Sequence, residues 1–324
     1  MEASRLLRGS AAVVAAILLA VLLVVGATGL ARAASSGAPG APGEKLIWTP
    51  ADKDGFGTSK STASKVWYTL NDGELTEVYY PDLGTPSVRD LQFIVSDGKT
   101  FAERETEATT QSVQLVDGRA LEYRQINTDR DGKYRITKTY VTDPDRPSVL
   151  VDVTFEPLTG EPYQLYAIYD PALSNGGDDD TATSRNGQLL ANDGKSASVL
   201  LGAPGFQEVS SGYLGTSDGW TDLRSDYDMD WQYASASKAG NVVQMARTTL
   251  TGLSGSQHLT LSLGFGAMFS GARSTAQDSL AAGSPGSQKA TRPAGTSTST
   301  RCSRHRRAWD RPADCGVRPT MFRP

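Results

Sequence analysis

Short β-type segments rich in Val, Ile, Tyr, Phe and Thr recur along most of the chain and leave little room for helices. Nine are evident: Val66–Leu70, Glu77–Tyr80, Leu91–Val95, Tyr134–Val141, Val149–Phe155, Gln164–Tyr169, Val199–Leu201, Val242–Leu250 and Leu259–Phe265. Within Tyr134–Val141 and Leu259–Phe265, apolar and polar residues alternate, a pattern typical of a strand with one buried face and one solvent-exposed face. Helical periodicity appears only over Ser274–Ala282. The sequence therefore predicts an all-β domain, a large antiparallel sandwich of two packed sheets.

Turn dipeptides separate many of these segments. They are Asp72-Gly73, Asp97-Gly98, Asp117-Gly118, Asp131-Gly132 and Asp193-Gly194. Glycine readily adopts the positive φ that tight primed turns require. These five positions are therefore predicted to be hairpin turns with glycine at positive φ.

The charge of the β-type region limits its partners. Residues 34 to 283 carry 20 Lys and Arg against 33 Asp and Glu, a net charge of −13. A region this acidic is not expected to bind nucleic acid or anionic membrane. It also contains no cysteine, which excludes a disulfide framework and a thiolate metal site there. We predict a flexible Ser/Gly/Pro/Ala leader over residues 34–44, followed by a β domain over residues 45–273 that its core alone must stabilise.

The N-terminus has the features of an export signal. Arg5 and Arg8 precede an apolar run from Ala11 to Val25, and Ala31-Arg32-Ala33 is a small-x-small cleavage site. The apolar run is shorter than the roughly 20 residues that span a bilayer. We therefore predict a signal peptide over residues 1–33, contact with the membrane only through that transient segment, and a secreted, extracellular protein.

One short motif suggests a serine hydrolase. Gly215-Thr216-Ser217-Asp218-Gly219 matches the G-x-S-x-G nucleophile elbow, and His258 follows downstream. An elbow needs a strand that feeds a helix, but the residues after the motif show no helical period, and His258 opens an alternating strand. A serine esterase that uses Ser217 is therefore the least favoured of the three functions considered for this chain.

A run of acidic residues offers a candidate metal site. Asp178, Asp179 and Asp180 follow Asn175-Gly-Gly, and clustered carboxylate oxygens could hold Ca²⁺. Their spacing is not that of an EF-hand loop, and acidic loops are usually solvated. The solvated loop is the favoured interpretation, with Ca²⁺ as the alternative.

Aromatic and acidic residues come together in a second acidic stretch. Trp220 and Trp231 lie among aspartates that include Asp218 and Asp222, and Tyr213 is close by in sequence. Aromatic rings can stack on sugars, and carboxylates can accept hydrogen bonds from sugar hydroxyls. These five residues are therefore predicted to contact either a carbohydrate or a neighbouring domain.

Longer motifs resemble a known family. The segment VWYTLNDGELTEVYYP at Val66–Pro81, continued by Arg89–Gly98, is similar to the N-terminal β domain of bacterial glucoamylases and glucodextranases of glycoside hydrolase family 15. Tyr169–Asn175 and Ser211–Leu223 share this resemblance, which covers Lys45–Ala282. It implies a supersandwich of two large antiparallel sheets, packed against a helical (α/α)₆ barrel.

The resemblance also implies where catalysis takes place. An inverting hydrolase needs an acid and a carboxylate held about 6.5–9.5 Å apart, and in this family both are glutamates of the barrel. No position of this chain corresponds to either, so no catalytic residue is assigned.

The expected function follows from that assignment. It is the role of the non-catalytic N-terminal domain of a secreted glucoamylase-like α-glucan hydrolase, whose full-length relatives release glucose from non-reducing ends with inversion. Its partner would be an α-glucan or the missing barrel. A free-standing carbohydrate-binding module is the alternative.

The sequence changes character after Gly283. Residues 284–324 carry nine Lys and Arg, two Asp and Glu, both cysteines and no hydrophobic periodicity. When this stretch is back-translated and read from the third base of each codon, it permits an Ala-rich string that resembles the family's helical linker. We therefore interpret residues 274–283 as the start of a linker helix, and residues 284–324 as a frameshifted, disordered tail that replaces the catalytic domain. In the rival interpretation the basic tail is authentic, binds acidic cell-wall polymers and forms a Cys302–Cys315 disulfide.

Overall fold

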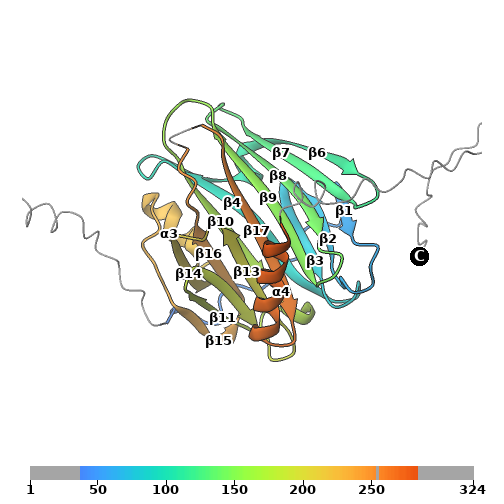
Figure 1. Ribbon diagram of the computed structural model, residues 1–324. Helices are drawn as coiled ribbons and strands as arrows, with labels where there is room; N and C mark the ends of the chain where they lie inside the picture. Colours follow the sequence, from blue (N-terminus) through green and yellow to red (C-terminus); the bar gives the residue numbers. More distant parts are fainter. Residues whose placement is uncertain (1–36, 253–254, 284–324) are drawn as a thin grey trace, which may run out of the picture.

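Two antiparallel sheets form the described part of the chain, as the computed structural model shows for residues 37–252 and 255–283 (Figure 1). The predicted signal peptide and the predicted tail lie outside these residues. The first sheet has eight strands in the order β1-β2-β3-β4-β10-β16-β14, with β5 paired to β4. Its strands are β1 Gly55–Thr58, β2 Trp67–Asn71, β3 Glu74–Tyr79, β4 Pro86–Ser96, β5 Ala102–Arg104, β10 Gln164–Pro171, β14 Glu208–Tyr213 and β16 Val242–Arg247.

The second sheet has nine strands in the order β15-β11-β12-β13-β17-β9-β8-β7-β6. They are β6 Thr109–Asp117, β7 Glu122–Asp129, β8 Tyr134–Thr142, β9 Ser148–Pro157, β11 Asp180–Arg185, β12 Gln188–Asn192, β13 Ala197–Ala203, β15 Ser235–Gly240 and β17 Gln257–Gly266. The helical elements described are α2 Glu105–Ala108, the 3₁₀ turn η1 Leu173–Asn175, α3 Gly219–Asp226 and α4 Phe269–Ala282. The chain first crosses from the first sheet to the second at α2, between β5 and β6.

The prediction of an all-β sandwich is confirmed. Each of the nine predicted segments lies wholly or partly in a strand, and the helical pattern of Ser274–Ala282 lies in α4. Four of the five predicted turn glycines have positive φ, among them Gly73, whose neighbour Asp72 also does. Gly118 does not, and the prediction for that turn is wrong because Leu121 takes the left-handed conformation there instead.

The main core lies between the sheets. Its cluster of buried side chains includes Tyr68 and Phe93 from the first sheet, and Phe155 and Phe265 from the second. The alternation along β8 and β17 explains this, because the apolar residues of both strands point into the same layer. Even the Tyr68 hydroxyl is satisfied there, since it donates to the carbonyl oxygens of Leu121 and Tyr140 at 2.9 and 3.1 Å.

A charged pair interrupts this apolar layer. Lys138 occupies an inward position of β8, and its Nζ lies 2.6 Å from Oε1 of Glu105 and 2.5 Å from the carbonyl oxygen of Gly73. The Phe93 N–H donates to Glu105 Oε1 at 2.9 Å. Asn127 Nδ2 donates to Glu105 Oε2 at 2.6 Å and to Gly73 O at 2.7 Å. These contacts join α2, the β2–β3 turn and strands of both sheets.

Burial opposes ionisation of both partners. Lys138 and Glu105 are each 0% exposed. Loss of solvation raises the pKa of Glu105 and lowers the pKa of Lys138, while each opposite charge offsets part of the shift. The pair therefore depends on its mutual attraction and on its hydrogen bonds.

Helix α4 packs against the outer face of the second sheet (Figure 1). Its buried residues Ala272 and Ala276 join Leu190, Val199 and Leu201 in a separate apolar cluster. The helix approaches closely because β17 presents glycine beneath it. A Cβ on Gly264 would lie 2.5 Å from the Ala276 nitrogen and 2.7 Å from the Ala272 carbonyl oxygen.

An N-terminal segment, residues 37–49, runs along one end of the sandwich. The Ala38 N–H donates to Ser235 O at 2.7 Å, the Glu44 N–H donates to Leu214 O at 3.0 Å, and Pro42 O accepts from the Asn241 N–H at 2.8 Å. The prediction of a flexible leader over residues 34–44 did not anticipate these contacts. Among the helices of residues 37–252 and 255–283, none is long and apolar enough to cross a membrane.

Replacing Lys138 by Met should leave the Glu105 carboxylate buried without a counter-charge. We expect a loss of about 3–5 kcal/mol in the free energy of unfolding, measured by urea titration at pH 7. The double variant Lys138→Met/Glu105→Gln should recover more than half of that loss. Arg135→Met is the control, because Arg135 lies on the same strand with a partly exposed side chain, and its Nη1 is 3.7 Å from Glu156 Oε2, a pair worth under about 1 kcal/mol. Equal losses from Lys138→Met and Arg135→Met would contradict this account.

Adding one methyl group at Gly264 should separate α4 from the sheet. The new Cβ would meet the helix backbone, which cannot rotate away, so we expect Gly264→Ala to cost about 1–3 kcal/mol. Gly271→Ala is a matched control inside α4, where the nearest atom lies 4.0 Å away and the helix should gain about 1 kcal/mol. Chemical denaturation of both variants checks the expectation of opposite signs.

Candidate functional site

Although Tyr213 at the end of β14 is buried against Ala182 and Ala236 of the second sheet, the other four of the five predicted contact residues lie in or beside α3, on the outer face of the first sheet. Leu223 and Met229 pack there against Tyr166 and Met245, and Trp220 lies at the edge of this cluster. Helix α3 and the loop after it therefore cover a part of the sheet that would otherwise expose apolar side chains.

Asp218 begins α3. It is the N-cap residue, and its Oδ1 accepts hydrogen bonds from the N–H groups of Trp220 and Thr221 at 2.9 and 3.0 Å. Its Oδ2 accepts from the Gly215 N–H at 2.7 Å and from the Thr221 hydroxyl at 2.8 Å. Both oxygens of this buried carboxylate are occupied, so Asp218 acts as a cap in this structure.

Asp222 and Tyr213 are also buried and already bonded. Asp222 Oδ2 accepts from the Trp231 N–H at 2.5 Å, and burial raises the pKa of Asp222 to about 6 although backbone N–H groups favour its charged form. The Tyr213 hydroxyl donates to the carbonyl oxygen of Lys238 and accepts from the N–H of the same residue, both at 2.9 Å. These two side chains fix the loop after α3 and the second half of β15.

The two tryptophans are half-buried and remain partly accessible. The Arg104 guanidinium lies over the Trp220 ring, with its central carbon 5.0 Å from the ring centroid. The Trp231 and Tyr233 rings are tilted against each other, with centroids 6.4 Å apart. Of the five predicted residues, the geometry thus leaves Trp220 and Trp231 with a face that could meet a ligand or a domain.

The G-x-S-x-G motif does lie between a strand and a helix. The absence of a helix after it was the wrong prediction, because Gly219–Asp226 forms α3 once Asp218 caps it. The Ser217 hydroxyl is nevertheless buried, donates to Pro39 O at 2.7 Å and accepts from the Tyr213 N–H at 3.0 Å. His258 lies on β17 of the other sheet, where Nδ1 is 3.0 Å from Thr154 Oγ1. The structure therefore does not bring the serine and the histidine together.

The acidic run of residues 178–180 does not converge on one point. Asp178 is exposed, and its Oδ1 accepts from the Leu46 N–H at 3.1 Å. Asp180 is buried and accepts from the Leu173 N–H at 3.0 Å. Across residues 37–252 and 255–283, no three His, Cys, Asp or Glu side chains gather in a way that could hold a metal ion.

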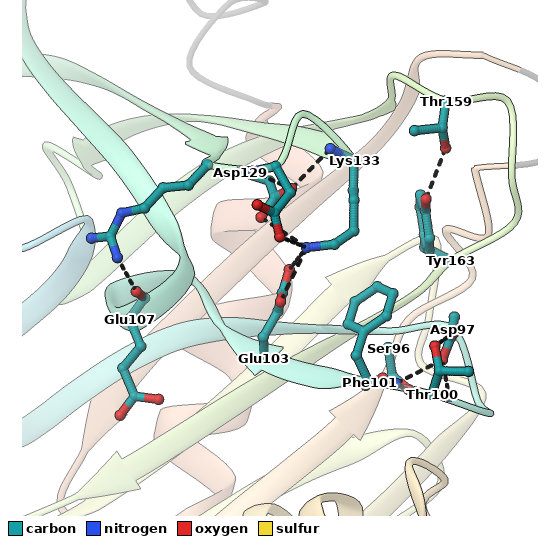
Figure 2. A network of polar contacts seen from close by, with 12 residues as sticks. Ser96, Asp97, Thr100, Phe101, Glu103, Glu107, Asp129, Lys133, Thr159 and Tyr163 are labelled. Atoms are coloured by element: carbon teal, nitrogen blue, oxygen red, sulfur yellow. Dashed lines mark hydrogen bonds and ion pairs between the residues drawn. The ribbon is translucent and has the colours of Figure 1, made fainter.

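A charged network between β5 and the β7–β8 turn was not predicted from the sequence (Figure 2). Lys133 Nζ lies 3.1 Å from Glu103 Oε1, 3.3 Å from Asp129 Oδ1 and 3.2 Å from Asp131 Oδ2, and it also lies over the Phe101 ring at 5.0 Å. These partners raise the pKa of Lys133. The D-x-D-x-K spacing in the β7–β8 turn was its only sequence signal, and the side chain of Glu103 completes it from β5. With its charges paired, the network joins the two sheets.

Known proteins share this domain. The family model described as "Glucodextranase, domain N" matches residues 38–291. A glucoamylase of Clostridium sp. (strain G0005) is 38% identical over 215 residues, which make up 64% of this chain and 30% of that protein. A crystal structure of bacterial glucoamylase complexed with acarbose matches with a TM-score of 0.72 at 35% identity, covering 77% of this chain and 37% of that one.

The chain spans about a third of the length of these two relatives. The family match, in contrast, extends over most of this chain and includes the segments that carry the sequence resemblance. The resemblance to the N-terminal β domain of bacterial glucoamylases and glucodextranases is thereby confirmed, and the chain belongs to the family of glucodextranase N domains.

Proposed function

We propose that this chain supplies the non-catalytic N-terminal domain of a secreted, glucoamylase-like α-glucan hydrolase. The reaction of the whole enzyme would be the inverting release of glucose from non-reducing ends. The observation that carries the proposal is that a solved bacterial glucoamylase contains this fold at 35% identity, yet the shared part is only 37% of that chain. The domain is thus one portion of a larger hydrolase in that relative.

The state of the acidic side chains supports a non-catalytic role. Inverting hydrolysis needs one carboxylic acid that can give up a proton and one carboxylate free to activate water. Asp218 and Asp222 instead hold backbone N–H groups, and Glu103 is bound to Lys133. These aspartates and this glutamate serve to stabilise the fold.

The place of α4 supports a link to a further domain. It packs on the second sheet with Ala272 and Ala276, and its described part ends at Ala282. In our proposal residues 274–283 begin a linker helix, and residues 284–324 are frameshifted sequence in place of a barrel. The signal peptide over residues 1–33 belongs to the same proposal and rests on its charged, apolar and small-residue regions.

The 324-residue chain, expressed in a bacterial host, should appear in the medium with Ala34 as its first residue and release no glucose from maltooligosaccharides. Reading the same DNA in the shifted frame beyond Gly283 should give a longer protein that does release glucose with inversion, followed by polarimetry or NMR. Glucose release by the 324-residue chain would refute the non-catalytic role. A shifted frame that soon meets a stop codon would refute the frameshift.

A binding test addresses the two tryptophans. If the domain braces a barrel, then the purified chain should show no retention on insoluble starch or dextran, and Trp220→Ala and Trp231→Ala should not change that. If it binds glucan directly, the wild type should be retained, and each substitution should weaken retention, since stacking on one ring contributes about 0.5–1.5 kcal/mol beyond area burial. Trp67→Ala, on β2 away from α3, is the matched control for the loss of one indole.

A further inference from the structure

Two carboxylates face each other where β11 begins and β12 ends. Thr181 and Asn192 are the outermost paired residues of these antiparallel strands, and Asp180 and Asp193 are the residues next to them. The same short segment touches both, because Asp180 accepts from the Leu173 N–H and the adjacent Ser174 hydroxyl lies 3.2 Å from Ser196 Oγ in the Asp193 turn. Consistent with this placement, the charge of Asp193 acts on Asp180 and raises its pKa.

Each carboxylate has one satisfied oxygen and one bare oxygen. Asp180 is 0% exposed, its Oδ2 accepts from the Leu173 N–H at 3.0 Å, and its Oδ1 is buried with no hydrogen-bond partner. Asp193 Oδ1 accepts from the N–H groups of Lys195 and Ser196 at 2.8 and 2.7 Å, whereas its buried Oδ2 meets no donor in hydrogen-bond geometry. The backbone thus fixes both side chains and leaves an acceptor oxygen of each without a donor.

Within the described part of the chain, no close ion pair compensates the charge of this pair, although hydrogen bonds from Ser174, Ser196 and Lys195, along with the more distant Lys195 ammonium, lower the pKa of Asp193. No ion pair within 4.0 Å joins either carboxylate to a cationic side chain of the described residues. The exposed Asp178 and Asp179 add further negative charge, and burial together with these charges raises the pKa of Asp180 to about 7. A buried anion without a counter-charge is costly, so such a site takes up a proton or a cation.

A third oxygen lies beside the two carboxylates. The Ser174 hydroxyl favours the charged form of Asp193 and is 3.2 Å from Ser196 Oγ. The nearby side chains therefore offer carboxylate and hydroxyl oxygens. That donor set suits hard cations and not the softer transition metals.

We propose that Asp180 and Asp193, with the Ser174 hydroxyl, bind a hard divalent cation of the Ca²⁺ type. Ca²⁺ takes six to eight oxygen ligands in flexible geometry, so water and backbone carbonyls would complete its shell. Of the acidic run considered from sequence, only Asp180 belongs to this site, and its main partner lies thirteen residues further along the chain. The site ties the start of β11 to the β12–β13 turn, and it does not depend on the proposed function of the domain.

Thermal unfolding of the purified chain in EDTA or Ca²⁺ at constant ionic strength tests the site. At pH 8 and a Ca²⁺ concentration a hundred times Kd, we expect Tm to rise by roughly 5–10 °C. Calorimetric titration with CaCl₂ should give one site per chain. An unchanged Tm at pH 8 in millimolar Ca²⁺, with no heat of binding, would overturn the proposal.

The pH dependence separates a cation from a shared proton. Without metal, the pKa of Asp180 is raised on folding, so the folded state takes up a proton between about pH 4 and 7. Stability should therefore fall as pH rises through that window in EDTA, and Ca²⁺ should make the fall smaller by the share of Asp180, while the buried Glu74 and Asp170, whose pKa values are also raised to about 7, keep their share. A fall that is identical in EDTA and Ca²⁺ would mean that a proton alone satisfies the pair, and the proposal would be wrong.

Three substitutions locate the site. Asp180→Asn and Asp193→Asn should each abolish the Ca²⁺-dependent rise in Tm, and both should fold in EDTA because they remove a repelling charge. Asp178→Asn is the matched control, since Asp178 is exposed and its oxygen accepts from the Leu46 N–H. It should keep the full rise. Loss of the rise in Asp178→Asn, or its survival in Asp180→Asn, would overturn the assignment.

Discussion

The buried pair of Lys138 and Glu105 is the constraint on which the arrangement of the two sheets depends. It lies where the chain passes from the first sheet to the second, directly at the start of α2. A bare charge in this layer would be strongly unfavourable, so the turn at Gly73 and the strand residue Asn127 must lie where their oxygen and amide complete the pair. The hydrogen bonds of this set are satisfied together in the observed register of β8.

Helices α4 and α3 cover parts of the outer faces of the two sheets, and each is held in a different way. On the second sheet α4 approaches closely because Gly264 and Gly266 leave room for its backbone. On the first sheet α3 is short, and aspartates at its start and middle bind the backbone of the surrounding loops. Part of the acidity of this domain is therefore structural. In this cysteine-free domain, carboxylates such as Asp218 and Asp222 hold loops in place through hydrogen bonds to backbone N–H groups.

Sequence patterns predicted the strands that are richest in core residues and missed others, among them the edge strand β15 and the interior strands β7, β11 and β12, for physical reasons. Strands such as β8 and β17 are packed against the core, so their alternation is visible in the sequence. Strand β15, Ser-Ala-Ser-Lys-Ala-Gly, has no such pattern and exists because β11 pairs with it. The helix after Ser217 was missed because its hydrophobic face is narrow and its stability comes from the Asp218 cap. Among the candidate residues, proximity in sequence to Trp220 did not reveal that Asp218, Asp222 and Tyr213 face inward.

The motifs that carry the family resemblance stabilise the fold of this domain. They therefore indicate the family and give no information about catalysis. The first motif contains the turn whose Gly73 carbonyl accepts from Lys138, and another contains the cap of α3. In this chain such residues stabilise the fold, whatever reaction the whole protein performs. The motifs therefore indicate the family through the fold that they stabilise. Catalysis is a separate matter, because it needs an acid and a base that are free to exchange protons, and Asp218 and Asp222 are instead bound to backbone N–H groups.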